Sequence, residues 1–282
     1  MMDVIQSPAI MQEWSKNRRA EGFKLGLVPT MGFLHEGHLS LVKKAVELCD
    51  KVIVSIFVNP IQFGQGEDFE QYPRDLSRDL GLLEREGVDI VFAPTAREMY
   101  PVKFGTFVES FGLEDKLCGK SRPGHFRGVT TVVSKLFNIC LPDVAVFGQK
   151  DAQQVMIIEK MVRDLNFPVE IVRGAIVREG GGLAMSSRNS YLTPEDRENA
   201  TVLNKSLLMA ERMIHEGMRD PAKVKEAIVN MIGQTPGTRI DYVDILSAED
   251  LSDLQDISGK TLIALAVHFS GARLIDNLVV EV

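Results

Sequence analysis

The stretch PTMGFLHEGHLSLVKKA, residues 29–45, joins the end of an apolar strand pattern to the start of an amphipathic helix pattern. A helix that begins there presents unpaired backbone amides and a partial positive charge, which favour a phosphate group. Gly32 and Gly37 permit close approach of the backbone to a ligand. His35 and His38 are three residues apart, so in a first helical turn they share one face, where an imidazole can donate to a phosphate oxygen. The stretch therefore predicts a strand–loop–helix unit that binds phosphate.

Two other interpretations of this histidine pair stay open: a zinc pair and two ordinary loop histidines. Zinc needs a third and a fourth ligand. The remaining histidines, His125, His215 and His268, have no spacing that matches such a site. The position of the pair between the first strand and its helix favours the phosphate interpretation.

Apolar, β-branched runs alternate with helical patterns on both sides of this stretch. The predicted strands cover residues 23–29, 52–58, 88–93, 144–147 and 169–177, and the predicted helices lie near 37–49, 75–86, 128–140 and 151–165, after an opening helix that follows Ser7-Pro8 and ends near Arg19. Continuous strand–helix alternation is typical of a parallel sheet with helices on both faces. We predict a Rossmann-like α/β fold that binds its ligands beyond the carboxyl ends of the strands.

The pattern changes after residue 177. A Gly-rich, polar stretch leads into a long helix capped by Thr193 with Pro194 at its first position, and a second helix follows Asp220-Pro221. Three alternating segments then predict a small antiparallel sheet. We therefore expect two domains, a Rossmann-like one over residues 1–177 and a smaller α+β lid domain over residues 178–282.

Composition limits the function classes. The chain has 282 residues, 45% hydrophobic and 25% charged, which is typical of a globular protein. Its net charge of −7 offers no basic field for nucleic acid. We see no secretory signal and no apolar run near the ~18 residues that a membrane span needs. Three scattered cysteines in apolar contexts indicate buried, reduced thiols, and we expect a cytoplasmic protein with no nucleic-acid or membrane partner.

Two segments follow later strands at the same predicted edge of the sheet. In GQKDAQQ, residues 148–154, Lys150 can place a positive charge on phosphates and Asp151 can accept from ribose hydroxyls, although Asp151 also suits a plain helix cap. In VNPIQFG, residues 58–64, the amides of Asn59 and Gln62 donate and accept, which suits a substrate with hydroxyls and a carboxylate. An Asn-Pro turn with a solvent-facing glutamine is an equally good interpretation of that segment.

Two loops offer further polar groups. MSSRN, residues 185–189, carries two hydroxyls and a guanidinium, which can close over a triphosphate if the loop is mobile. An ordinary flexible linker is the alternative. RPGHFRG, residues 122–128, is either a further anion-binding loop or a surface turn, and we leave it outside the predicted site.

The His-Glu-Gly-His stretch resembles the signature of HxGH nucleotidyltransferases, and the longer string PTMGFLHEGHLSLV resembles the pantothenate synthetase (pantoate–β-alanine ligase) family. Further segments resemble that family in order and spacing: VSIFVNPIQFG (54–64), DFEQYPRDL (68–76), RPGHFRGV (122–129), VFGQKDAQQ (146–154) and GLAMSSRN (182–189). The resemblance implies an ATP-dependent, AMP-forming ligase that condenses pantoate with β-alanine through a pantoyl adenylate. It also implies a homodimer.

Carried onto this chain, the resemblance implies a distributed site. Its catalytic groups are His38, His35 and Lys150. Its ATP contacts are Met31, Gly32, Phe33, Leu34, His35, Glu36, Gly37, His38, Gly148, Gln149, Lys150, Asp151, Val177, Met185, Ser186, Ser187 and Arg188, and its pantoate and β-alanine contacts are Gln62, Gln154 and Asn59. Mg²⁺ is expected to bridge the ATP phosphates, and no metal site on the protein itself is predicted.

One segment departs from the family pattern, and two other functions stay open. Gly180, Gly181 and Gly182 are consecutive where relatives often have an acidic residue, which predicts a more flexible hinge. The alternatives are a nucleotidyltransferase that acts on another coenzyme precursor and a nucleotide-binding module without catalysis.

Overall fold

The computed structural model describes residues 2–282, and these form two compact units. The first unit comprises residues 2–111, Arg122–Gln149 and Ile157–Ala175, and the second comprises Gly112–Ser121, Lys150–Met156 and Ile176–Val282. The second unit thus takes up two short segments from the middle of the chain. The expected domain boundary after residue 177 stays a prediction.

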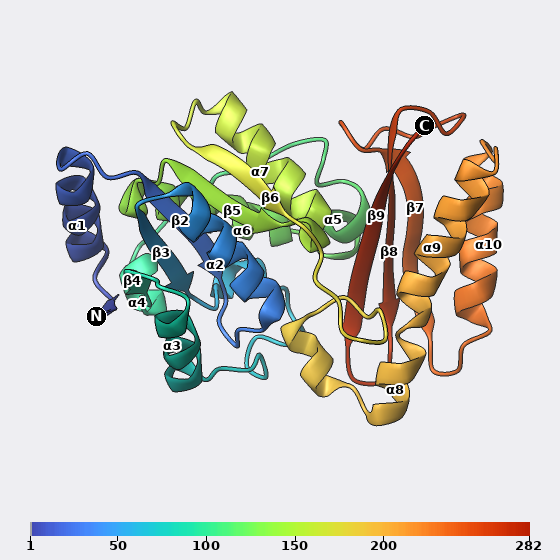
Figure 1. The fold of residues 1–282 in the computed structure, drawn as a ribbon, viewed down its shortest axis with the longest axis horizontal. Coiled ribbons are helices and arrows are strands. Elements are labelled where there is room, and N and C mark those ends of the chain that lie inside the picture. The colour runs from blue at the N-terminus through green and yellow to red at the C-terminus, as the bar shows by residue number, and fades with distance from the viewer. Residues whose placement is uncertain (1) are drawn as a thin grey trace. The chain divides into compact units, whose positions relative to one another are not determined.

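A sheet of six parallel strands forms the centre of the first unit (Figure 1). Its order is β1-β4-β3-β2-β5-β6, with bounds Asp3–Ile5 for β1, Leu25–Thr30 for β2, Lys51–Ile56 for β3, Ile90–Phe92 for β4, Val144–Gly148 for β5 and Glu170–Gly174 for β6. This confirms the predicted α/β fold. The edge strand β1 was not expected, because three residues with no clear alternation give no strand signal; it pairs parallel with β4.

Helices cover both faces of this sheet. They are α1 (Pro8–Ala20), α2 (Glu36–Leu48), α3 (Leu76–Arg85), α4 (Ala96–Met99), α6 (His125–Cys140) and α7 (Ala152–Asp164), with the 3₁₀ turns η1 (Pro60–Gln62) and η2 (Gln149–Asp151). Buried side chains of α2 and α3 share one apolar cluster with one face of the strands. The opposite face receives α1 and α6, which contact each other, as right-handed crossovers require.

The strand β2 and the helix α2 take these forms because each buries a regular apolar set. Leu25, Leu27 and Val28 are fully buried in β2, and Leu39, Val42 and Ala45 form the helix-period stripe that packs on the sheet. Parallel pairing brings β2 between β3 and β5. The carboxyl ends of these three strands therefore lie along one edge, where the first unit gathers its polar loops.

The second unit is built on an antiparallel sheet in the order β7-β8-β9, with bounds Arg239–Ser247, Lys260–His268 and Arg273–Glu281. Its other elements are α5 (Leu117–Ser121), η3 (Ser187–Tyr191), α8 (Pro194–Asn199), α9 (Val202–His215) and α10 (Pro221–Gly233). The long helix expected after Thr193 is two helices. The amide and the hydroxyl of Thr201 both donate to the carbonyl of Glu198, at 3.1 and 2.7 Å, which tightens the chain into a break there.

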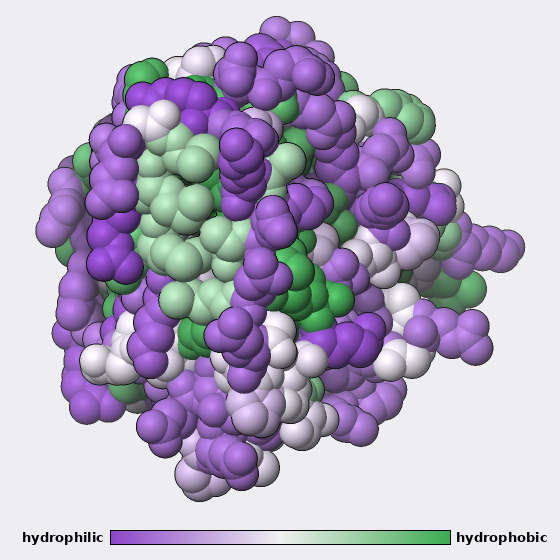
Figure 2. Space-filling model, turned by 90° about the vertical axis from the view of Figure 1, so that its right-hand side faces the viewer, coloured by the Kyte–Doolittle hydropathy of each residue, from purple (hydrophilic) through white to green (hydrophobic). Residues whose placement is uncertain are grey.

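The core of the second unit lies between its sheet and the pair α9 and α10. Four partly buried methionines, Met209, Met213, Met218 and Met231, pack against that core. Figure 2 faces the side where α9 and α10 lie in Figure 1 and shows an apolar area bordered by hydrophilic side chains. Across residues 2–282, every helix is too short or too polar to cross a membrane.

Candidate active site

The loop between β2 and α2 is held in an unusual backbone conformation. Gly32 has φ +80°, and a Cβ there would lie 3.0 Å from Ile56 and 3.1 Å from a carboxylate oxygen of Asp79. Phe33, which is not a glycine, also has a positive φ of 50°. Gly32 thus lies close to the side chains of Ile56 and Asp79, and the expected close approach of this backbone to a ligand stays a prediction.

Asp79, on α3, holds this loop in place. Its two carboxylate oxygens accept from the amides of Phe33 and Leu34 at 2.7 and 2.8 Å, and its side chain is 1% exposed. Burial raises the pKa of this carboxyl above its ordinary value, against the opposing effect of the two amide bonds. The neighbouring Arg78 donates to the carbonyl of Leu34 at 2.9 Å. Sequence reasoning missed Asp79, because its partners lie about 45 residues away in the chain.

His35 and His38 come together at the N-terminus of α2, as predicted. His35 is the N-cap residue, and its Nδ1 accepts from the amide of Gly37 at 3.2 Å. Nδ1 of His38 accepts from the amide of His35 at 3.3 Å, and the two ring centroids are 4.0 Å apart. Because both Nδ1 atoms act as acceptors, the ring hydrogen of each neutral imidazole sits on Nε2. The pair therefore presents two Nε2–H donors at a helix N-terminus, beside the exposed Glu36 of the first turn.

Gly148 is the last residue of β5 and Gln149 follows it, so both lie at the same sheet edge as the histidine loop. Gln149 accepts from Arg173 of β6 at 3.3 Å, and Arg173 also forms a bidentate pair with Glu159. The 3₁₀ turn η2 begins at Gln149. The first unit thus brings residues 31–38 and 148–149 together, which is what a nucleotide-binding edge requires.

The turn η1 places Gln62 next to the histidine loop. Gln62 is 9% exposed, and its Nε2 donates to Sδ of Met31 at 3.1 Å. Asn59 precedes the turn and is 1% exposed. The solvent-facing glutamine considered from the sequence is thus contradicted, because both side chains are buried.

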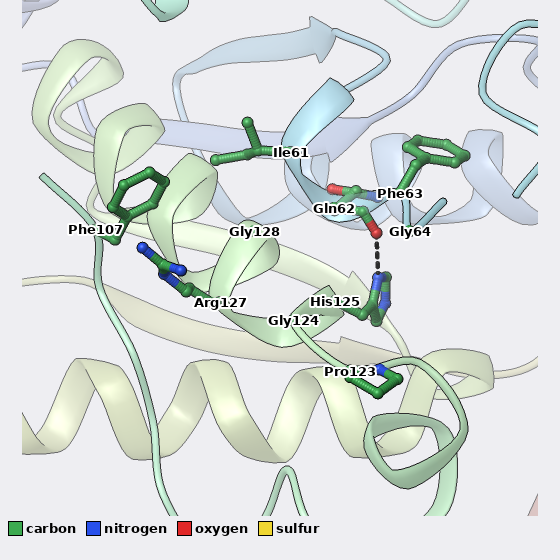
Figure 3. A pocket seen from close by; sticks show the side chains of 10 residues that line it. All are labelled: Ile61, Gln62, Phe63, Gly64, Phe107, Pro123, Gly124, His125, Arg127 and Gly128. Carbon is green, nitrogen blue, oxygen red and sulfur yellow. Dashed lines mark hydrogen bonds between the residues drawn. The ribbon is translucent and has the colours of Figure 1, made fainter. Parts of the chain in front are cut away.

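A buried histidine fixes the backbone of Gln62. Nδ1 of His125 lies 2.8 Å from the carbonyl of Gln62 (Figure 3). Nη1 of Arg122 lies 3.0 Å from His125 Nε2. A guanidinium can only donate, so Nε2 accepts and Nδ1 carries the hydrogen that Gln62 receives. Arg122 also forms a bidentate pair with Glu67. The RPGHFRG segment, left open between an anion loop and a surface turn, thus supports the turn at Gln62.

A pocket of about 170 Å³ opens beside this turn and the start of α6 (Figure 3). Arg127 lies on one side of it, with its guanidinium carbon 3.9 Å from the centroid of the Phe107 ring. Gly128 lies deeper, where a Cβ would approach the backbone of Gln62 to 2.5 Å. The absence of a side chain at Gly128 therefore lets η1 lie against α6.

The second unit holds the remaining predicted residues. Lys150 is anchored through its carbonyl, which accepts from Asn277 of β9 at 2.9 Å. Asp151 is exposed and Gln154 is partly buried on the first turn of α7. Between them the buried Gln153 donates to the carbonyls of Leu113 and Lys116, both at 2.7 Å, which ties this turn to the preceding loop.

The loop of residues 177–189 is also in the second unit. The carbonyl of Val177 accepts from the amide of Met185 at 2.9 Å, and Ser186 caps the turn η3 by accepting from the amide of Arg188 at 3.3 Å. Ser187 is buried. Asn189 donates to Glu179 at 2.8 Å, and Arg197 donates to the same carboxylate at 2.6 Å. These contacts hold the end of the loop against Glu179, near its start.

The glycine run takes part in several hydrogen bonds, and the more flexible hinge expected from the sequence stays a prediction. The carbonyl of Glu179 accepts from the amide of Gly182 at 2.8 Å, and the amide of Glu179 donates to the carbonyl of Leu183, also at 2.8 Å. Arg178 pairs with the buried Asp276 and donates to the carbonyl of Gly182 at 3.0 Å. The run is therefore a hydrogen-bonded turn, and only Gly182, at φ +92°, needs a conformation that favours glycine.

Comparison with known proteins gives one consistent result. The family model for pantoate-beta-alanine ligase matches residues 3–279. Pantothenate synthetases of Syntrophomonas wolfei and Heliobacterium modesticaldum are 61% and 56% identical to the chain, with full coverage of both sequences in each case.

Two solved structures are similar over nearly the whole chain. The pantothenate synthetase of Thermus thermophilus has a TM-score of 0.93 at 44% identity, over 98% of this chain and 99% of its own. A pantoate-beta-alanine ligase from Francisella tularensis, complexed with a β-γ ATP compound and β-alanine, has a TM-score of 0.82 at 36% identity, over 99% and 97%.

Proposed function

Because the chain belongs to the pantoate–β-alanine ligase family and is an ATP-dependent ligase of pantoate and β-alanine, we propose that it works through a pantoyl adenylate. In the first step a carboxylate oxygen of pantoate attacks the α-phosphorus of ATP, and pyrophosphate leaves. In the second step the amine of β-alanine attacks the activated carbonyl, a proton is lost, and AMP leaves. Adenylation is needed because a free carboxylate has no good leaving group.

The histidine pair carries this proposal. His38 donates its Nε2–H to the oxygens around the α- and β-phosphorus, where negative charge grows as pyrophosphate departs, and His35 supports it. The observation behind these roles is that both Nδ1 atoms already accept from backbone amides, so both Nε2 atoms carry hydrogen. The two rings are tilted by 34° with centroids 4.0 Å apart, and the unpaired amides at the start of α2 are further hydrogen-bond donors for a phosphate.

Further charged and polar groups are assigned to the phosphates in this proposal. Lys150 acts as a point charge on the triphosphate, and Ser186, Ser187 and Arg188 donate from the loop. Mg²⁺ travels with ATP on its phosphate oxygens.

Other groups orient the substrates. We assign the nucleoside and phosphates of ATP to the backbone and side chains of residues 31–38 and 148–151, to Val177 and to Met185. Pantoate and β-alanine contact Gln62 and Gln154, with Asn59 directly behind Gln62. Catalysis then consists mainly of positioning and charge stabilisation.

One assay tests the proposal and separates it from the alternatives. We expect pantoate-dependent exchange of labelled pyrophosphate into ATP, and rapid AMP release only after β-alanine is added. A nucleotidyltransferase would release a stable adenylylated product and ignore the amine. A binding module without catalysis would give no exchange, and absence of exchange with pantoate refutes the adenylate route.

His38→Ala tests the histidine role. We expect kcat to fall by about 10²–10³-fold, as for loss of one charge-stabilising donor, with the melting temperature nearly unchanged. His215→Ala, in the last turn of α9, is the matched control and should keep full activity. A His38→Ala enzyme that retains most of its kcat contradicts the assignment. We further propose that the enzyme is cytoplasmic and forms a homodimer. Sedimentation of the purified protein tests the dimer.

A further inference from the structure

The carboxamide of Asn59 is enclosed by other parts of the first unit. Its Nδ2 donates to the carbonyl of Gly128 at 3.1 Å and to Oε1 of Gln62 at 3.0 Å. Its Oδ1 accepts from the hydroxyl of Tyr100 at 2.8 Å. Both amide hydrogens are therefore used, and the residue is 1% exposed. An amide in this position acts on a substrate only through its neighbours.

The orientation of this amide follows from one partner that can only accept. The carbonyl of Gly128 faces Nδ2, so the nitrogen must lie on that side. With the amide reversed, Oδ1 would face two oxygens, those of Gly128 and Gln62, at hydrogen-bond distance. The Tyr100 hydroxyl completes the set as a donor, and burial raises its pKa above the ordinary value, which keeps it protonated.

The consequence appears at the end of the Gln62 side chain. Since Oε1 of Gln62 faces Asn59, its NH₂ group points the other way, towards Sδ of Met31 at 3.1 Å. A thioether is a weak acceptor. Among residues 2–282, the Gln62 NH₂ group donates to this sulfur. A carboxylate or hydroxyl oxygen of a substrate would accept a stronger hydrogen bond from the same NH₂ group than the thioether does.

We propose that Tyr100 and Asn59 are positioning residues that fix the Gln62 carboxamide with its NH₂ group towards the substrate, so that Gln62 selects an acceptor oxygen of pantoate. This rests on the proposed function, in which Gln62 contacts pantoate. Asn59, expected from the sequence to touch pantoate, acts from behind Gln62.

Two single variants disturb this relay, the chain of hydrogen bonds from Tyr100 through Asn59 to Gln62, in different ways. Tyr100→Phe removes the donor to Oδ1 of Asn59, which lets both amides turn. We expect the KM for pantoate to rise about three- to tenfold, the effect of one hydrogen bond, with kcat and the KM for ATP unchanged. Asn59→Asp keeps the acceptor for Tyr100 but loses both donors, so Gln62 must turn its NH₂ group inward. The rise in pantoate KM is then larger than for Tyr100→Phe.

A double-mutant cycle of Tyr100→Phe with Gln62→Ala decides whether Tyr100 acts through Gln62. The measurement is kcat/KM for pantoate at saturating ATP and β-alanine, with melting temperatures recorded for every variant. We expect Gln62→Ala to lower this value by about tenfold or more, and Tyr100→Phe to lower it by less than about twofold in that background, since no amide is left to turn. Tyr242→Phe, which removes a partly buried, hydrogen-bonded hydroxyl in the second unit, is the control and should leave pantoate KM unchanged.

The outcomes separate the two proposals. If Tyr100→Phe is equally harmful with and without Gln62, or raises the KM values of ATP and pantoate alike, the relay is overturned and Tyr100 has only a structural role. If Gln62→Ala keeps the parent kcat/KM for pantoate, the proposed substrate contact itself is wrong.

Discussion

Gly128→Ala puts the close approach of η1 to α6 to a direct test. A Cβ at this position would lie 2.5 Å from Cα of Gln62 and from the carbonyl oxygen of Ile61, and 2.7 Å from the amide nitrogen of Gln62. All three atoms are backbone, so no side chain can turn away. An ordinary contact starts at 3.4 Å, and the turn must therefore retreat by about 0.9 Å, the difference between 3.4 and 2.5 Å.

Two energies oppose each other in this variant. Alanine is better than glycine inside a helix by about 1 kcal/mol. Forcing a methyl group into a packed site costs about 1–3 kcal/mol. The net loss of unfolding free energy is thus small, about 0–2 kcal/mol. The displacement acts on Gln62, however, and a shift of about 1 Å at a substrate contact can cost about 10²-fold in rate.

The assay compares Gly128→Ala with a second helical Gly→Ala variant that is expected to keep full activity. Gly81, in the middle of α3, has open space where a Cβ would sit, with no atom within 4 Å, so Gly81→Ala should raise the unfolding free energy by about 0.5–1 kcal/mol and keep full activity. Gly128→Ala should lower kcat/KM for pantoate by about 10- to 100-fold. If Gly128→Ala behaves like Gly81→Ala in both measurements, the close approach does not constrain the site, and the reasoning is refuted.

Three further expectations concern the support of the site. Asp79→Asn can accept from only one of the two loop amides, so we expect kcat to fall about tenfold or more. Asp75→Asn, at the N-cap of the same helix, should keep full activity, because Asn caps a helix as well as Asp does. Equal activities of the two variants would remove Asp79 from the site. Gly182→Ala should raise the KM for ATP, because φ is +92° and its Cβ would lie 2.6 Å from Asn204, whereas Gly180→Ala meets no atom within 4 Å and should have no effect. Burial raises the pKa of Glu67, but the hydrogen bonds and charge of Arg122 outweigh it and hold that pKa below the ordinary 4.5. The stability that Glu67 contributes over Glu67→Gln is therefore present above pH 4.5 and is lost as pH falls from there through the lowered pKa. Denaturant titrations in which this difference grows as the pH falls below 4.5 contradict this.

Local sequence patterns predicted most of the parallel strands and the placement of the histidine pair. The alternation of apolar strands with helices predicted five of the six parallel strands, because burial on both faces leaves a continuous apolar run. His35 and His38 were predicted to share a face because a helical turn brings residues three apart together, and the caps at Thr193 and Asp220 follow from side chains that bond amides two or three residues on.

Tertiary structure decided which polar groups hydrogen-bond to one another. Asn59, predicted from the sequence to contact pantoate, gives one of its amide hydrogens to Gly128, 69 residues away, and its action through Gln62 is our proposal. The loop that carries the histidines depends on Asp79, and the turn at Gln62 depends on His125, and neither pairing leaves a local signal. The sequence alone determined the fold class and the placement of His35 and His38 together at a helix start, since both depend on periodicity and on neighbours within a few residues. The orientation of each site amide depends on acceptors that only the folded chain brings within about 3 Å, and only the structure could decide it.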